Sequence, residues 1–130
     1  MKIGILISGS GSNMIKLIES CQNSKNAFIE IVISNNPDAK GIEYAKLKNI
    51  KTKVIDHKEF SEREDFDNKV HEVLLENNVD FLCNAGFMRI HGEKFVEKWF
   101  NKHLNIHPSL LPSFKGLNTH ERAIKSGVKF

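Results

Sequence analysis

The sequence predicts an α/β domain built on a doubly wound, mainly parallel β-sheet. Three observations support this prediction: short apolar runs alternate with stretches of helical period, a glycine-rich loop follows the first apolar run, and a polar pair closes the fifth. Such alternation is typical of parallel strands joined by helices that cover both faces of the sheet. At 130 residues the chain is long enough for one domain with a core and too short for two, so residues 1–130 are expected to form a single domain.

Five strands are expected from apolar runs of strand length that are bounded by turn residues. The first run, Ile3 to Ile7, breaks at Ser8-Gly9 and is too short to be the core of a signal peptide. The predicted strands cover residues 2–8, 28–34, 53–56, 81–85 and 104–107. A further strand is expected to begin at Val128, where the chain stops two residues later. This indicates a domain that is incomplete at its C-terminal end, either truncated or completed by another polypeptide.

The helices are predicted from apolar residues that recur with a helical period. In the first helix these residues are Met14, Leu17, Ile18 and Cys21, and in the third they are Phe66, Val70, Val73 and Leu74. The predicted helices cover residues 13–24, 41–48, 63–77, 93–100 and 120–126. Gly127 follows the last of them and is a favourable helix stop.

The composition excludes several classes of protein. The chain is 40% apolar and 27% charged with a net charge of +3, and its lysines and arginines are scattered among acids, so nucleic-acid binding is not expected. Cys21 and Cys83 are the only cysteines and lack a C-x-x-C spacing, so neither a disulfide framework nor a bound metal is expected. No apolar run approaches the length of a membrane span. We therefore expect a cytoplasmic protein without a membrane partner.

The loop from Ser8 to Asn13 joins the first strand to the first helix and is predicted to bind an anion. Backbone N–H groups and the helix dipole favour negative charge there, and the glycines allow close approach. A plain glycine-rich turn with a helix N-cap is the alternative. A dinucleotide fingerprint would need a small residue at Met14 and an acid near Ser34 and Asn35, and a P-loop would need Gly-Lys-Ser/Thr. A single phosphate on a small substrate fits this loop better than NAD or ATP.

Asn105 and His107 close the fifth predicted strand, and Pro108 should end it. Residues i and i+2 of a strand share a face, so the carboxamide and the imidazole would project together at the carboxyl end of the sheet. An amide that stabilises an oxyanion beside an imidazole that handles a proton suits acyl transfer. The alternative to a catalytic pair is equally open: Asn105 caps the strand end, and His107 is an ordinary hydrogen-bonded histidine.

Three motifs together carry a resemblance to a known family. They are LISGSGSN at the first loop, AGFMRI at residues 85–90 and NIHPSLLPSFKGLNTH at residues 105–120. In this order they resemble the phosphoribosylglycinamide formyltransferases, which are folate-dependent enzymes of purine synthesis. Methionyl-tRNA formyltransferases and formyltetrahydrofolate hydrolases carry similar Asn-x-His segments, whereas SGSGSN and GLNTH narrow the resemblance to the glycinamide ribonucleotide enzymes. The resemblance implies a Rossmann-like fold and transfer of a formyl group from 10-formyltetrahydrofolate to the amine of glycinamide ribonucleotide.

The resemblance also implies roles for individual residues. The ribonucleotide phosphate would be held by Gly11, Ser12 and Asn13. The folate would contact Arg63, Met88, Arg89, Ile90, His91 and Asn105, and the catalytic pair would be Asn105 and His107. From the residues alone, Arg63 could equally be a solvated helix residue, and Met88 and Ile90 could be core residues. Leu111-Pro112 is a candidate cis peptide bond beside the site.

The chain departs from the family pattern at two positions and at its end. Asn118 stands where the family usually has His, and His91 stands where it commonly has an apolar residue. An Asp that orients the catalytic His in the family would lie beyond Phe130, together with further strands and a helix. We therefore expect this form to bind phosphate ligands better than it catalyses, and to be a monomer or a weak homodimer. A formyltetrahydrofolate hydrolase and a noncatalytic remnant are the alternative functions.

Overall fold

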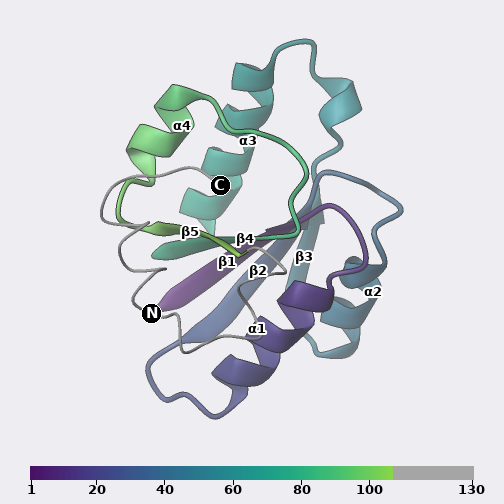
Figure 1. Cartoon of the computed structure of the whole chain (residues 1–130), viewed down its shortest axis with the longest axis vertical. Helices are drawn as coiled ribbons and strands as arrows, with labels where there is room; N and C mark the ends of the chain where they lie inside the picture. The colour runs from purple at the N-terminus through teal and green to yellow at the C-terminus, as the bar shows by residue number, and fades with distance from the viewer. Residues whose placement is uncertain (107–130) are drawn as a thin grey trace.

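Five parallel strands form one sheet in residues 1–106. The computed structural model describes residues 1–106 and leaves residues 107–130 undescribed. The strands are β1 (Lys2–Ile7), β2 (Phe28–Ser34), β3 (Lys51–Val54), β4 (Phe81–Ala85) and β5 (His103–Ile106). Their order across the sheet is β3-β2-β1-β4-β5, and every neighbouring pair is parallel (Figure 1). The predicted α/β fold with a parallel sheet is confirmed.

Helices cover both faces of the sheet, as a doubly wound fold requires. The helices are α1 (Ser12–Gln22), α2 (Lys40–Leu47), α3 (Arg63–Glu76) and α4 (Glu93–Lys98), with a short 3-10 turn η1 (His57–Glu59) before α3. Helices α1 and α2 lie on one face, and α3 and α4 lie on the other (Figure 1). The predicted fifth helix, residues 120–126, and the start of a strand at Val128 lie outside the described residues.

Two apolar clusters, one on each face, hold these layers together. On the first face, alternate residues of β1 such as Ile5 and Ile7 pack with Met14 and Ile18 of α1. On the second face, Leu6 and its strand neighbours pack with residues of α3 and α4, namely Phe66, Val70, Val73, Leu74 and Phe95. The predicted apolar stripe of α3 is thus the contact surface of that helix.

The prediction of β3 was displaced by two residues. The sequence predicted a strand at 53–56, whereas the structure has Lys51–Val54. This strand lies at the edge of the sheet, and three of its four residues are exposed, so its position follows from pairing with β2 rather than from burial. Helix α4 is also shorter than predicted, because Trp99 and Phe100 turn away from the helix before β5.

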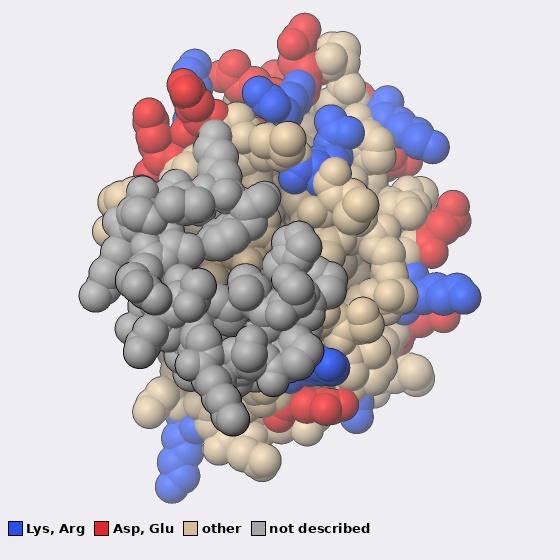
Figure 2. All heavy atoms as spheres, viewed as in Figure 1, with Lys and Arg blue, Asp and Glu red and all other residues tan. Residues whose placement is uncertain are grey.

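Charged side chains of both signs are mixed on the surface. On the face shown in Figure 2, lysines and arginines alternate with acids around the rim, and the described part of this face has no extended field of one sign. Such a surface gives little long-range attraction for a polyanion. Across residues 1–106, none of the helices is both long enough and apolar enough to cross a bilayer.

Candidate active site

The strand order reverses between β1 and β4, so the carboxyl ends of these two strands form the switch point of the sheet. From β1 the chain adds β2 and β3 on one side, and it then crosses over to add β4 and β5 on the other. Ligands of open α/β sheets bind in the crevice at such a switch point. The two loops that flank it are residues 8–11 after β1 and residues 86–92 after β4. The predicted phosphate loop and the predicted folate segment are therefore the two walls of one crevice.

The wall after β1 is the start of helix α1. Gly11 is the N-cap residue in the left-handed conformation, with φ 78°, and no side chain caps the helix. The first N–H groups of a helix have no partner within it, so those of Ser12 and Asn13 are donors for an external acceptor. The side chain of Ser12 is exposed, whereas Asn13 is 8% exposed.

The N-terminus of α2 lies against the same loop. The N–H of Gly41 donates to the carbonyl of Gly9 at 3.1 Å, and α2 also lacks a side-chain cap. A Cβ added to Gly11 would lie 2.9 Å from Cα of Gly41, so the two backbones are in close contact. Two uncapped helix N-termini therefore converge at this loop, and both contribute positive potential there.

The wall after β4 presents apolar side chains to solvent. Met88 is 81% exposed and Ile90 is 69% exposed, so the alternative that they belong to the core is wrong. Between them, the guanidinium of Arg89 lies 5.8 Å from the centroid of the Phe66 ring. Phe87 is buried and anchors the segment in the core cluster of α3 and α4.

His91 is the buried end of this wall. It is 6% exposed, and its ring stacks between those of Phe87 and Phe95, at centroid distances of 5.1 and 4.2 Å. Its Nδ1 lies 3.1 Å from Oδ1 of Asp67, and its Nε2 lies 3.0 Å from Nδ2 of Asn84. A neutral ring protonated at Nδ1 donates to the carboxylate and accepts from the carboxamide, so both contacts are satisfied by one tautomer.

A second histidine packs edge-on against His91. The ring centroid of His103, at the start of β5, lies 5.4 Å from that of His91. Burial, with electrostatic repulsion between the two imidazoles as a smaller cause, lowers the pKa of His103 to about 3. His103 is therefore neutral near pH 7.

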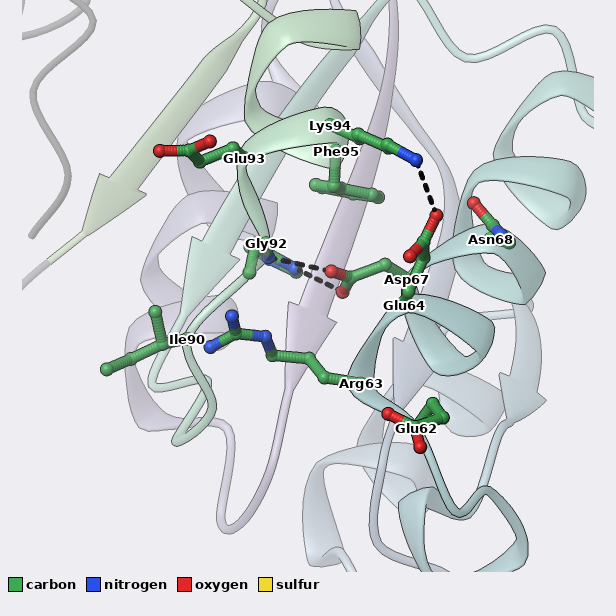
Figure 3. Close-up of a pocket in the computed structure, with 11 residues that line it drawn as sticks. Glu62, Arg63, Glu64, Asp67, Asn68, Ile90, Gly92, Glu93, Lys94 and Phe95 are labelled. Carbon is green, nitrogen blue, oxygen red and sulfur yellow. Dashed lines mark hydrogen bonds and ion pairs between the residues drawn. The ribbon is translucent and has the colours of Figure 1, made fainter.

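A pocket of about 570 Å³ opens between the start of α3 and the start of α4 (Figure 3). The side chain of Arg63 extends across it toward Ile90 and Gly92. Lys94 is already paired with Glu64, with 3.0 Å between Nζ and Oε1. The remaining lining residues are Glu62, Asp67, Asn68, His91, Glu93 and Phe95. Arg63 therefore meets the predicted folate segment across this pocket.

The ends of β4 and β5 bring a pair of carboxamides together. Asn84 and Asn105 are partners in the register of the two parallel strands, so their side chains project from the same face of the sheet. Asn84 is 2% exposed and Asn105 is half-buried. The other half of the predicted catalytic pair, His107, lies outside the described residues, as does Asn118.

Three polar residues of the site did not emerge as candidates from the sequence. Asp67 lies beside Phe66 on the buried side of α3, and a charge on an apolar stripe is the signal that could have identified it. Asn84 interrupts an apolar strand in the same way. Ser8 begins the predicted anion-binding loop, but no role of its own was predicted for it, because a serine before a glycine-rich turn is ordinary.

Comparison with known proteins decides the family. The model of the formyl transferase family matches residues 1–130. The chain belongs to the formyl transferase family. It is 40% identical over 129 residues to phosphoribosylglycinamide formyltransferase of Escherichia coli. That alignment covers 98% of the chain and 60% of the Escherichia coli enzyme. It is 49% identical over 128 residues to the human trifunctional purine biosynthetic protein adenosine-3. That alignment covers 98% of the chain and 13% of the human protein.

Solved structures of formyltransferases have the same fold. A phosphoribosylglycinamide formyltransferase from Coxiella burnetii aligns with a TM-score of 0.79 at 41% identity, over 98% of this chain and 61% of that one. The enzyme from Brucella melitensis aligns with a TM-score of 0.79 at 39% identity, over 98% of this chain and 67% of that one. The resemblance to phosphoribosylglycinamide formyltransferases is thereby confirmed. The chain spans about 60% of the length of the bacterial relatives.

Proposed function

We propose that this formyl transferase domain transfers a formyl group from 10-formyltetrahydrofolate to the amine of glycinamide ribonucleotide. The observation that supports the proposal is the switch point between β1 and β4. On one side of it lies an uncapped helix start, which suits an anion, and on the other lies an exposed apolar segment. A phosphorylated acceptor and a flat aromatic donor need these two kinds of surface side by side.

The ribonucleotide phosphate would bind at the start of α1. Gly11 allows close backbone approach, and the N–H groups of Ser12 and Asn13 donate to the phosphate oxygens. The nearby start of α2 adds to the positive potential without contributing a charged side chain. This arrangement favours a single phosphate.

The folate would bind along the segment after β4. Met88 and Ile90 offer apolar contact for the pterin and benzoyl rings, with Arg89 and His91 completing the wall. Arg63 supplies a guanidinium at the adjoining pocket, which suits the carboxylates of the folate tail. The residues present therefore fit a formylfolate as co-substrate.

Formyl transfer requires stabilisation of an oxyanion and movement of one proton. The amine nitrogen forms a bond to the formyl carbon, and the bond from that carbon to the folate nitrogen breaks, with the proton passing from the amine to the departing nitrogen. Asn105 would donate a hydrogen bond to the formyl oxygen as negative charge develops on it, and His107 would carry the proton, directly or through water. Neither step calls for a metal or a covalent intermediate on the protein.

A titration with both ligands tests this proposal against the two alternatives. A formyltransferase binds glycinamide ribonucleotide and a formylfolate analogue, and it releases formate slowly when the ribonucleotide is absent. A formyltetrahydrofolate hydrolase would bind the folate alone and release formate without the ribonucleotide. A noncatalytic module would bind weakly or only through phosphate. Binding of folate alone, or of neither ligand, would contradict the proposed function.

Three expectations from the sequence accompany this proposal. We infer that residues 1–130 act as one catalytic domain, that the protein works in the cytoplasm, and that it is a monomer or a weak homodimer. Light scattering of the purified protein over a range of concentrations tests the oligomeric state.

A further inference from the structure

Ser8 stands where the chain leaves β1, and its hydroxyl joins three segments that are far apart in the sequence. Its Oγ accepts a hydrogen bond from the N–H of Met88 at 2.9 Å and donates to Oδ1 of Asn35 at 2.6 Å. A hydroxyl has one proton to donate and lone pairs that accept, so both contacts are made at once. The side chain thus links the end of β1 to the ends of both neighbouring strands, β2 and β4.

The bond to Met88 spans the crevice at the switch point. Ser8 begins the loop that forms the phosphate wall, and Met88 belongs to the segment that forms the folate wall. The two residues are separated by 80 positions in the sequence. The exposed Met88 side chain points away from the core, so this backbone contact fixes the part of the folate wall that carries the ligand-facing groups.

Ser8 is itself held firmly from the β2 side. Its carbonyl accepts from Nδ2 of Asn36 at 3.3 Å, and its partner Asn35 is 3% exposed. The Nδ1 atom of His57 lies 3.2 Å from Nδ2 and 3.1 Å from the backbone oxygen of Asn35. With Nδ1 unprotonated, His57 accepts a hydrogen bond from Nδ2 of Asn35, and this contact fixes the orientation of the carboxamide. Its Oδ1 thereby stays directed at Ser8.

We propose that Ser8 is a positioning residue that sets the separation of the ribonucleotide loop and the folate segment across the crevice. This inference rests on the proposed function and adds a residue that need touch neither ligand. The amine and the formyl group react only when each is placed to within about 0.5 Å of the productive geometry. A fixed separation of the two walls therefore lets both ligands bind in that arrangement together. Loss of the hydroxyl leaves the loop after β1 and the segment after β4 each intact. It removes the hydrogen bond that fixes the distance between them.

Ser8→Ala removes this link, and the chain offers a matched control. Asp80 accepts the N–H of Lys2 through Oδ2 at 2.8 Å, and it joins the ends of the same two strands at the opposite edge of the sheet. Asp80→Ala therefore deletes one side-chain contact between β1 and β4 far from the crevice. Ser8→Thr retains the hydroxyl and serves as the conservative rescue.

The first measurement is hydrogen exchange at the Met88 amide, and the second is the affinity for a formylfolate analogue at saturating glycinamide ribonucleotide. In Ser8→Ala we expect exchange to be about tenfold faster and affinity to be about tenfold weaker, as for one lost hydrogen bond. Asp80→Ala and Ser8→Thr should retain both wild-type values within about twofold. Wild-type affinity in Ser8→Ala overturns the inference, and so does an equal loss in Asp80→Ala. Wild-type protein that binds neither ligand instead refutes the proposed function, and the inference falls with it.

Discussion

Asp67 and His91 form a buried pair that ties helix α3 to the segment after β4. Oδ1 of Asp67 lies 3.1 Å from Nδ1 of His91, and Oδ2 accepts the N–H of Gly92 at 2.8 Å. The two side chains are 4% and 5% exposed, and a carboxylate removed from water is stable only when its oxygens are bonded. The position of the folate wall is therefore set by a charge on α3.

Asp67→Asn should destabilise the fold strongly. The neutral amide cannot accept from both His91 and Gly92 as well as the carboxylate does, and it brings a donor group that the site does not need. We expect a loss of about 3 kcal/mol in the free energy of unfolding, measured by urea denaturation. Asp65→Asn, at an exposed position in the first turn of the same helix, should cost about 0.5 kcal/mol. Equal losses in the two variants would show that the buried pair has no special role.

Gly11→Ala should damage the phosphate loop. The positive φ of 78° strains any side chain, and the new Cβ would lie 2.9 Å from Cα of Gly41. We expect a stability loss of about 2 kcal/mol and weaker binding of glycinamide ribonucleotide, measured by thermal unfolding and calorimetry. Gly9→Ala is the control, because a Cβ there meets nothing within 4 Å. An unchanged ribonucleotide affinity in Gly11→Ala would argue against a phosphate at this helix start.

His103 should make the fold less stable in acid. Its pKa is lowered to about 3 in the folded protein, below its ordinary 6.5, chiefly by burial. Between these values the unfolded chain binds a proton that the folded chain excludes, so stability falls as the pH falls through this window. The free energy of unfolding of the wild type relative to His103→Gln should therefore decline by up to about 1.4 kcal/mol per pH unit. Denaturation of both proteins from about pH 7 to about pH 5 tests this, and parallel curves would contradict it.

Arg63→Ala should weaken folate binding without affecting the ribonucleotide. The guanidinium extends across the pocket, whereas the neighbouring cation Lys94 is paired with Glu64 (Figure 3). We expect about a tenfold loss of affinity for a formylfolate analogue that carries its glutamate tail. Lys94→Ala should change this affinity by less than about twofold. An analogue without the glutamate tail should bind the wild type and Arg63→Ala with equal affinity. A lower affinity of Arg63→Ala for this analogue would contradict a contact between Arg63 and the carboxylates of the tail.

The sequence predicted the parallel sheet and its order of elements because apolar runs record burial directly. It misplaced β3, whose residues are mostly exposed at the sheet edge and therefore carry no burial pattern. The glycine turn before α1 was predictable from local chemistry, since Gly11 and the helix start are neighbours in sequence. The Asp67 to His91 contact was not predictable, because it joins positions 24 residues apart through tertiary packing.

The two walls of the crevice were predicted separately, and the structure relates them to each other. Motifs at residues 8–13 and 85–90 indicated two ligand surfaces, but periodicity does not specify which strands are neighbours. Pairing of β1 with β4 brings them together, and Ser8 joins them directly. The sequence allowed Met88 to be either a core residue or a folate contact, and its exposure excludes the core position. The sequence could not decide between them, because an isolated apolar residue in a loop belongs to no helical or strand periodicity.

Transfer of an isotopically labelled formyl group from 10-formyltetrahydrofolate to glycinamide ribonucleotide tests the central claim most directly. The purified protein and its Asn105→Ala variant are compared under the same conditions, with the label followed into the ribonucleotide. The account predicts a labelled formyl ribonucleotide with the wild type and a rate lower by about 100-fold in the variant, as for one lost oxyanion donor. Absence of labelled product with the wild type, or equal rates for the two proteins, would contradict it.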